Sequence, residues 1–176
     1  MGLVHIYCGD GKGKTSAAVG LAVRAAGCGK RVVIARFLKT DNSGEVEILK
    51  KIPEVTLIPC RKTFGFVRSM DEETKRECAA YHRDLFGEAV KLAEHADLVV
   101  FDEIMAAVNY GMVPERDVLE FLENRPGRDQ TDGLEIVLTG RDPSEKLIAA
   151  ADYVSEICKR KHPFDRGIMA RRGVEY

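Results

Sequence analysis

Short apolar runs alternate along this chain with longer segments in which apolar residues recur every three or four positions. The runs are rich in valine, isoleucine and leucine, and they predict strands that are buried on both faces. The longer segments have the periodicity of amphipathic helices. The predicted strands span residues 3–7, 31–37, 55–58, 97–101, 134–138 and 153–157. The predicted helices span residues 14–28, 71–95, 114–124 and 143–150.

This alternation predicts the fold class. Strands that alternate with helices form an α/β protein, here with a mostly parallel sheet covered by helices on both faces. The chain has 176 residues, which suffice for one domain, and we expect that domain to span 1–176. Ligands of such sheets bind beyond the carboxyl ends of the strands, so we expect the site in the irregular segments. These segments are residues 40–44, 61–68, 126–133 and 162–173.

The turn between the first predicted strand and the first predicted helix carries the sequence CGDGKGKTS, residues 8–16. Its glycines allow several backbone N–H groups to face one anion, and the following helix points its free N–H groups at the same place. Lys14 adds a positive charge, and Thr15 offers a hydroxyl to Mg²⁺. The turn therefore predicts a phosphate-binding loop for a nucleoside triphosphate, in a P-loop NTPase fold of RecA-like type. The predicted binding residues are Gly9, Asp10, Gly11, Lys12, Gly13, Lys14, Thr15 and Ser16.

Polar residues follow two later strands in the same way. Asp102 and Glu103 end the fourth strand, where a carboxylate can hold Mg²⁺ directly or through water. The alternative is a solvated acidic turn. Arg141 follows the fifth strand and could reach a phosphate in bidentate fashion, or it could lie in a surface turn.

Two aromatic residues lie in an irregular, basic stretch between Lys62 and Arg68. Phe64 and Phe66 either pack under this loop as a small satellite core or cover the face of a flat ligand. A basic stretch near the carboxyl terminus, residues 159–172, is either a solvated face or a contact for phosphate or an acidic ligand.

Composition narrows the range of partners. The net charge is −1 at pH 7, so no overall basic field recruits nucleic acid, and no apolar stretch is long enough to span a membrane. The five cysteines form no C-x-x-C pair, and residues 3–7 form a core strand rather than an export leader. We therefore expect a cytoplasmic protein with reduced thiols.

Several short motifs occur in order over essentially the whole chain. They are GDGKGKT at 9–15, FLK at 37–39, GF at 65–66, VVFDE at 99–103, IVLTGR at 136–141, ADYVSE at 151–156, KHPFDRGI at 161–168 and GVEY at 173–176. This combination resembles the P-loop class of ATP:corrinoid adenosyltransferases, and the His-Pro-Phe-Asp-x-Gly element is its most specific part.

The resemblance implies an activity. In that family, the cobalt(I) of a corrinoid attacks the 5′-carbon of ATP, the adenosyl group moves to cobalt, and triphosphate leaves. It also implies that ATP lies in the loop in the reverse direction to that of ordinary P-loop enzymes. The implied corrinoid is cobalamin, cobyrinic acid diamide or cobinamide, and the implied pathway is adenosylcobalamin synthesis or salvage. A homodimer and a flavoprotein reductant are further implications.

The resemblance also assigns roles to individual residues. It makes Lys14, Glu103 and Phe66 the catalytic residues. Glu103 is the first choice for the Mg²⁺ shell beside Thr15, and Asp102 the second. Phe66 would crowd the lower face of the corrin and displace the axial ligand, with Phe64 as a possible substitute, because Arg68 stands where family members carry a tryptophan.

The main alternative is a P-loop ATPase or kinase, in which Glu103 orients water or an acceptor. It would release ADP rather than triphosphate. A GTPase switch is disfavoured because the chain has no Asn-Lys-x-Asp element, and a nucleic-acid motor would need a basic surface and a longer chain.

Overall fold

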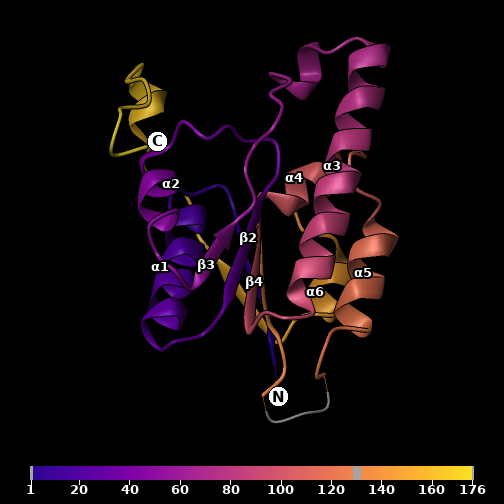
Figure 1. The fold of residues 1–176 in the computed structure, drawn as a ribbon. Coiled ribbons are helices and arrows are strands. Elements are labelled where there is room, and N and C mark those ends of the chain that lie inside the picture. The colour runs from indigo at the N-terminus through magenta and orange to yellow at the C-terminus, as the bar shows by residue number, and fades with distance from the viewer. Residues whose placement is uncertain (1, 129–131, 176) are drawn as a thin grey trace.

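The computed structural model describes residues 2–128 and 132–175. Their centre is a six-stranded sheet with the order β3-β2-β4-β5-β1-β6, in which each paired strand runs parallel to its neighbour (Figure 1). The strands are β1 (Val4–Cys8), β2 (Val32–Arg36), β3 (Val55–Leu57), β4 (Leu98–Asp102), β5 (Glu135–Thr139) and β6 (Tyr153–Glu156). Each predicted strand is confirmed to within two residues at its ends. The predicted loop 126–133 lies partly outside the described residues.

Helices cover both faces of the sheet (Figure 1). One face carries α1 (Lys14–Gly27) and α2 (Gly44–Leu49). The other face carries α3 (Glu72–Ala93), α4 (Ile104–Asn109), α5 (Glu115–Glu123) and α6 (Glu145–Ala149). Two short 3₁₀ helices span Val67–Ser69 and Pro163–Arg166. The α/β fold class is thus confirmed, whereas α2 and α4 were not predicted from the sequence.

The two apolar layers differ in the size of their side chains. Helix α1 packs on the sheet through Ala18, Ala22 and Ala26, which are almost fully buried and allow a close approach of the backbone. The opposite layer contains large rings, and Phe101 of β4 lies with its ring centroid 5.4 Å from that of Phe86 and 5.6 Å from that of Phe121. These contacts hold α1 on one face of the sheet, and α3 and α5 on the other.

The strand order determines which loops meet. Strand β5 lies between β1 and β4, and β2 lies on the far side of β4. Because the strands are parallel, the segments that follow β1, β2, β4 and β5 all emerge at the same edge, which is the upper edge in Figure 1. The expected position of the site beyond the carboxyl ends of the strands agrees with this arrangement.

A buried histidine lies near that edge, on α3. His82 is 3% exposed, and its Nδ1 has no hydrogen-bond partner among the described residues. Its ring lies among those of Tyr81, Phe37 and Phe64, at centroid distances of 5.1, 5.9 and 6.4 Å. Burial in this apolar setting disfavours the charged form and lowers the pKa of His82 from 6.5 to about 4.

We expect His82 to make the protein less stable in mild acid. The unfolded chain takes up a proton on this residue near pH 6.5, whereas the folded chain does so only near pH 4, so the free energy of unfolding falls as the pH drops through this window. The loss attributable to His82 is at most about 3 kcal/mol. Urea unfolding between pH 7 and pH 4.5 should show a shallower pH dependence in His82→Phe than in wild type. Identical slopes would show that His82 takes up its proton equally in both states.

Candidate active site

The glycines of the phosphate-binding loop serve two different purposes. Gly13 has φ 119° and begins α1 with open space beside it, so this position needs the left-handed conformation. Gly9 and Gly11 instead lie against the segment after β6, where an added Cβ would come 2.5 and 2.6 Å from the carbonyl oxygen of Ile157. The Gly11 N–H donates to that same oxygen at 2.7 Å. The conformation of the loop therefore depends both on its own glycines and on contact with the segment that follows β6.

The position usually held by the first glycine of this motif is part of the sheet. Cys8 is the last residue of β1, is 6% exposed, and has its Sγ 3.8 Å from the carbonyl oxygen of Ser155. Its side chain faces the core and leaves the loop free, which explains why a cysteine fits there.

Lys14 lies over the loop that precedes it. Its Nζ donates to the carbonyl oxygen of Gly11 at 2.9 Å, and the residue is only 9% exposed. Burial lowers the pKa of Lys14, while the negative charge of Glu103 acts in the opposite direction. The ammonium group is thus held over the loop that an anion would contact.

Three side chains, from the ends of β4 and β5 and from the segment after β2, meet beside Thr15. The Asp102 carboxylate, 2% exposed, accepts from the Thr15 hydroxyl at 3.0 Å and from the Thr139 hydroxyl at 2.7 Å. The Lys39 Nζ donates to the Asp102 carboxylate at 2.5 Å and to the Thr15 Oγ1 at 2.7 Å. Asp102 is therefore a buried, fully bonded carboxylate rather than part of a solvated acidic turn.

Glu103 occupies a constrained turn between β4 and α4. Its φ is 63°, unusual for a residue with a side chain, and its N–H donates to the Thr139 hydroxyl at 2.8 Å. Gly140 follows β5 next to this turn, and an added Cβ there would lie 2.5 Å from the Cβ of Met105. The first turn of α4 thus packs directly on the end of β5. Glu103 lies near enough to the phosphate-binding loop for its charge to oppose the lowering of the pKa of Lys14 by burial.

Basic residues border the loop on its other side. The Arg141 Nη2 lies 3.5 Å from the carbonyl oxygen of Asp10, and the Lys12 Nζ lies 3.3 Å from the Glu175 carboxylate. The Asp10 carboxylate accepts from the N–H of Lys159 at 2.8 Å, and this bond lowers the pKa of Asp10. Arg141 and part of the basic carboxyl-terminal stretch therefore lie beside the phosphate-binding loop.

A cavity of about 840 Å³ opens at the amino-terminal end of α1. Its walls include Thr15 and Ser16, residues from the 38–45 segment after β2, and residues 173–175 near the carboxyl terminus. In Figure 1 this carboxyl-terminal segment lies above α2, at the same edge of the sheet as the phosphate-binding loop. The cavity thus has both polar and apolar walls next to the loop, and it can accept the rest of a nucleotide.

The two aromatic residues of the 61–68 loop have different surroundings. Phe64 is partly buried against the core, with its ring 5.6 Å from that of Tyr81 and 5.0 Å from the Lys62 ammonium. Phe66 is 87% exposed and follows Gly65, which has φ 81°. Phe64 thus matches the satellite-core interpretation, whereas Phe66 is free to meet a ligand.

Comparison with known proteins places the whole chain in one family. A sequence model of the ATP:corrinoid adenosyltransferases BtuR/CobO/CobP matches residues 1–176. The chain belongs to this family. It is 34% identical to the corrinoid adenosyltransferase of Escherichia coli K12 over 178 residues, which covers 99% of this chain and 86% of that protein. The corrinoid adenosyltransferase CobA of Salmonella typhimurium LT2 is 34% identical over 177 residues, with the same coverage, and the Pseudomonas aeruginosa enzyme is 31% identical over 178 residues.

These matches confirm the resemblance seen in the motifs. The adenosyltransferase is an enzyme with ATP and a corrinoid as substrates. In the part of the chain that the structure describes, every helix is too short or too polar to cross a lipid bilayer.

The structure brings most of the predicted site residues of the adenosyltransferase to one place. The phosphate-binding loop, Asp102, Glu103 and Arg141 gather at the carboxyl ends of β1, β4 and β5, whereas Phe64 and Phe66 lie on the separate loop before α3. Lys39 and Thr139 were missed as site residues. The signal was present in both cases, because a polar residue ends β5 and a lysine follows β2 at the same sheet edge.

Proposed function

We propose that this adenosyltransferase transfers the 5′-deoxyadenosyl group of ATP to the cobalt(I) of a corrinoid and releases triphosphate. The full-length family match, over a phosphate-binding loop that is formed as its motif requires, carries this proposal. Cobalt(I) in the corrinoid substrate is itself a strong nucleophile, so the protein needs no activated serine or cysteine. Its task is to align the two substrates, to stabilise charge on the departing triphosphate and to exclude water.

The phosphate-binding loop supports the second of these tasks. We assign the Lys14 ammonium and the N–H groups of residues 12–16 to the triphosphate, because Lys14 lies over the loop and the N–H groups at the start of α1 have no partner within the helix. The Gly11 N–H is excluded, because it donates to the Ile157 carbonyl oxygen. Arg141, beside Asp10, adds a guanidinium at the rim of the same loop. The family resemblance implies that ATP lies in this loop in the reverse direction to that of ordinary P-loop enzymes.

A Mg²⁺ ion fits the oxygen atoms beside Thr15. The buried Asp102 carboxylate and the Thr15 hydroxyl are hard donors within 3.0 Å of each other, the kind of pair that holds Mg²⁺ while water and phosphate complete its shell. Bound there, the ion would neutralise charge on the triphosphate. Because Asp102 is the carboxylate in contact with Thr15, we place it ahead of Glu103 as the ligand. Glu103 would then act on Lys14 or on a water of the metal shell.

We expect Asp102→Asn to weaken the binding of Mg²⁺ more than Glu103→Gln does. The amide keeps the size of Asp102 and removes the charge beside Thr15, so the Mg²⁺ concentration for half-maximal rate should rise about tenfold or more. A titration of transfer rate against Mg²⁺ measures this. A larger shift in Glu103→Gln would restore Glu103 as the main ligand.

The same variants test base catalysis. Cobalt(I) has no proton to lose, so the pH–rate profile with pre-reduced corrinoid should keep its shape in Glu103→Gln. A steep limb that disappears in this variant would indicate a general base and favour a hydrolytic enzyme.

Phe66 is assigned to the lower face of the corrin. It is the exposed aromatic of the 61–68 loop, and an apolar ring there can keep water and the axial base away from cobalt. Arg68 in the following 3₁₀ helix would take the place of the family's tryptophan without supplying a second apolar ring. A homodimer and a flavoprotein reductant complete the proposal by family resemblance. The proposed cytoplasmic location rests instead on the cysteine pattern of the sequence.

An anaerobic assay with ATP, Mg²⁺ and chemically reduced cob(I)alamin tests the function. We expect one triphosphate for each adenosylated corrinoid. Release of ADP and phosphate, with no corrinoid product, would instead identify an ATPase or kinase.

A further inference from the structure

A cation of the chain itself lies on the proposed metal ligands. The Lys39 Nζ is 2.5 Å from the Asp102 carboxylate and 2.7 Å from the Thr15 Oγ1. A Mg²⁺ ion needs these oxygens at about 2.0–2.1 Å and keeps a shell of further oxygens around it. An ammonium and a divalent ion cannot share such a position, because both the space and the charge conflict. When the metal binds there, the Lys39 ammonium must move.

The backbone around Lys39 is held in an unusual conformation. Leu38, directly before it, has φ 52°, a left-handed conformation that costs energy for a residue with a side chain. Asp102 accounts for part of this turn, because its carbonyl oxygen accepts the N–H of Phe37 at 2.8 Å. The turn directs Lys39 back toward the phosphate-binding loop rather than along the direction of β2.

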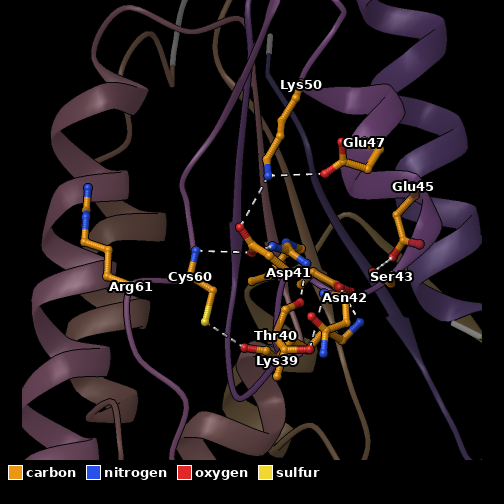
Figure 2. Close-up of polar contacts among 12 residues, drawn as sticks. Lys39, Thr40, Asp41, Asn42, Ser43, Glu45, Glu47, Lys50, Cys60 and Arg61 are labelled. Atoms are coloured by element: carbon orange, nitrogen blue, oxygen red, sulfur yellow. Dashed lines mark hydrogen bonds and ion pairs between the residues drawn. The ribbon is translucent and has the colours of Figure 1, made fainter.

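A buried ion pair anchors the segment after Lys39. Arg36 at the end of β2 is 6% exposed, donates to the Thr40 carbonyl oxygen at 2.8 Å, and forms an ion pair with Asp41. Figure 2 shows the Asp41 carboxylate between the N–H of Cys60, at 3.2 Å, and the Lys50 ammonium, at 3.7 Å. The backbone of Lys39 is thus fixed on both sides, while its four-carbon side chain, 27% exposed, lines the 840 Å³ cavity.

We propose that Lys39 is a further catalytic residue, which exchanges its place on Thr15 and Asp102 with Mg²⁺ and then binds the departing triphosphate. This inference rests on the proposed function. In the transfer step the cobalt(I) electron pair forms the Co–C5′ bond, the C5′–O bond breaks, and its electron pair leaves on the triphosphate oxygen. No proton moves. Lys39 and Lys14 place two positive charges around that anion, and Arg36 with Asp41 acts as the positioning pair.

If Lys39 exchanges with the metal, removal of its ammonium should raise the affinity for a divalent ion and lower the rate of adenosyl transfer. While Lys39 neutralises Asp102, a divalent ion must displace it in order to bind. Removal of the ammonium leaves a buried carboxylate without its cation, which favours a divalent ion. The same removal takes a positive charge from the departing triphosphate, which slows transfer. A lysine that merely supported the fold would weaken both properties together.

The test compares Lys39→Met with wild type in two measurements. Mn²⁺ binding without nucleotide, followed by electron paramagnetic resonance, should become about tenfold tighter. The kcat with saturating Mg²⁺, ATP and pre-reduced cob(I)alamin should fall about 100-fold. Lys39→Arg keeps the cation and should keep the Mn²⁺ affinity near the wild-type value. Lys51→Met removes an exposed lysine that takes no part in the contacts described for the phosphate-binding loop, and it should change neither measurement.

The outcomes are separable. Unchanged or weaker Mn²⁺ binding in Lys39→Met overturns the exchange, and a kcat within twofold of wild type overturns the catalytic role. Thermal unfolding of each variant confirms that the comparison concerns folded protein. The same assay measures triphosphate release by the wild-type enzyme. If the proposed function is wrong, wild type itself will release no triphosphate. If only this inference is wrong, wild type will be active and the variants will differ from the expected values.

Discussion

Replacement of Lys14 by alanine should reduce adenosyl transfer at least 100-fold while the fold stays intact. Lys14 contacts the Gly11 carbonyl oxygen and lies within the phosphate-binding loop, so it contributes little to either apolar layer. A charge that stabilises a leaving anion in such a setting is typically worth about 3 kcal/mol or more in the transition state. Steady-state turnover with pre-reduced corrinoid, together with the thermal unfolding midpoint, measures both parts of the expectation.

Lys30→Ala is the matched control for Lys14→Ala. Lys30 is exposed in the turn after α1 and should leave turnover at the wild-type level. Near-wild-type turnover in a folded Lys14→Ala protein would remove Lys14 from the triphosphate site.

Phe66→Ala should slow transfer that starts from cobalt(II) far more than transfer that starts from cobalt(I). The exposed Phe66 ring is assigned to the lower face of the corrin, where it excludes water and the axial base. Loss of that ring leaves the cobalt(II) five-coordinate and hard to reduce, whereas pre-reduced cobalt(I) needs no ligand removal. We expect a loss of about 100-fold in the first assay and of less than about tenfold in the second.

Phe64→Ala is the control within the same loop. Because Phe64 packs on Tyr81 and the core, its removal should affect both assays alike, through loop packing. Spectroscopy of the cobalt(II) corrinoid with ATP bound should show a four-coordinate fraction that falls in Phe66→Ala. An unchanged fraction would make Phe66 a packing residue and would leave ligand removal to another part of the protein.

The main strands and the phosphate-binding loop could be predicted from sequence because their signals are local. Buried strands read as continuous apolar runs, and the loop needs only its own glycines, Lys14 and Thr15. Helices α2 and α4 were not predicted because each has only six residues, too few to show a helical period. The residue before α4, Glu103, also has a left-handed conformation and forms no side-chain cap that would mark the start of the helix. The five-residue α6 was predicted because Pro143 and Ser144 mark a helix start before it.

The contacts of the site depended on information that is not local. Asp102 meets Thr15 because the sheet places β4 and β1 on the two sides of β5, with their carboxyl ends at one edge. The sequence motifs do not contain this strand order. The motif therefore suggested two carboxylates without showing which one meets the hydroxyl. Lys39 was not predicted as a site residue for the same reason. The direction of its side chain depends on the left-handed conformation of Leu38 and on the Arg36–Asp41 ion pair.

The support of the phosphate-binding loop by the segment after β6 has a consequence for how the protein is made. Cys8, just before the loop, contacts Ser155, which follows it by 147 residues, and Gly11 donates to Ile157. A ribosome therefore synthesises the loop long before the segment that supports it. We expect a growing chain to form its first helix early, yet to acquire ATP binding only when residues 153–157 have emerged from the exit tunnel. The ability to bind ATP then depends on a segment that is made long after the loop, so that chains without this segment do not hold the nucleotide.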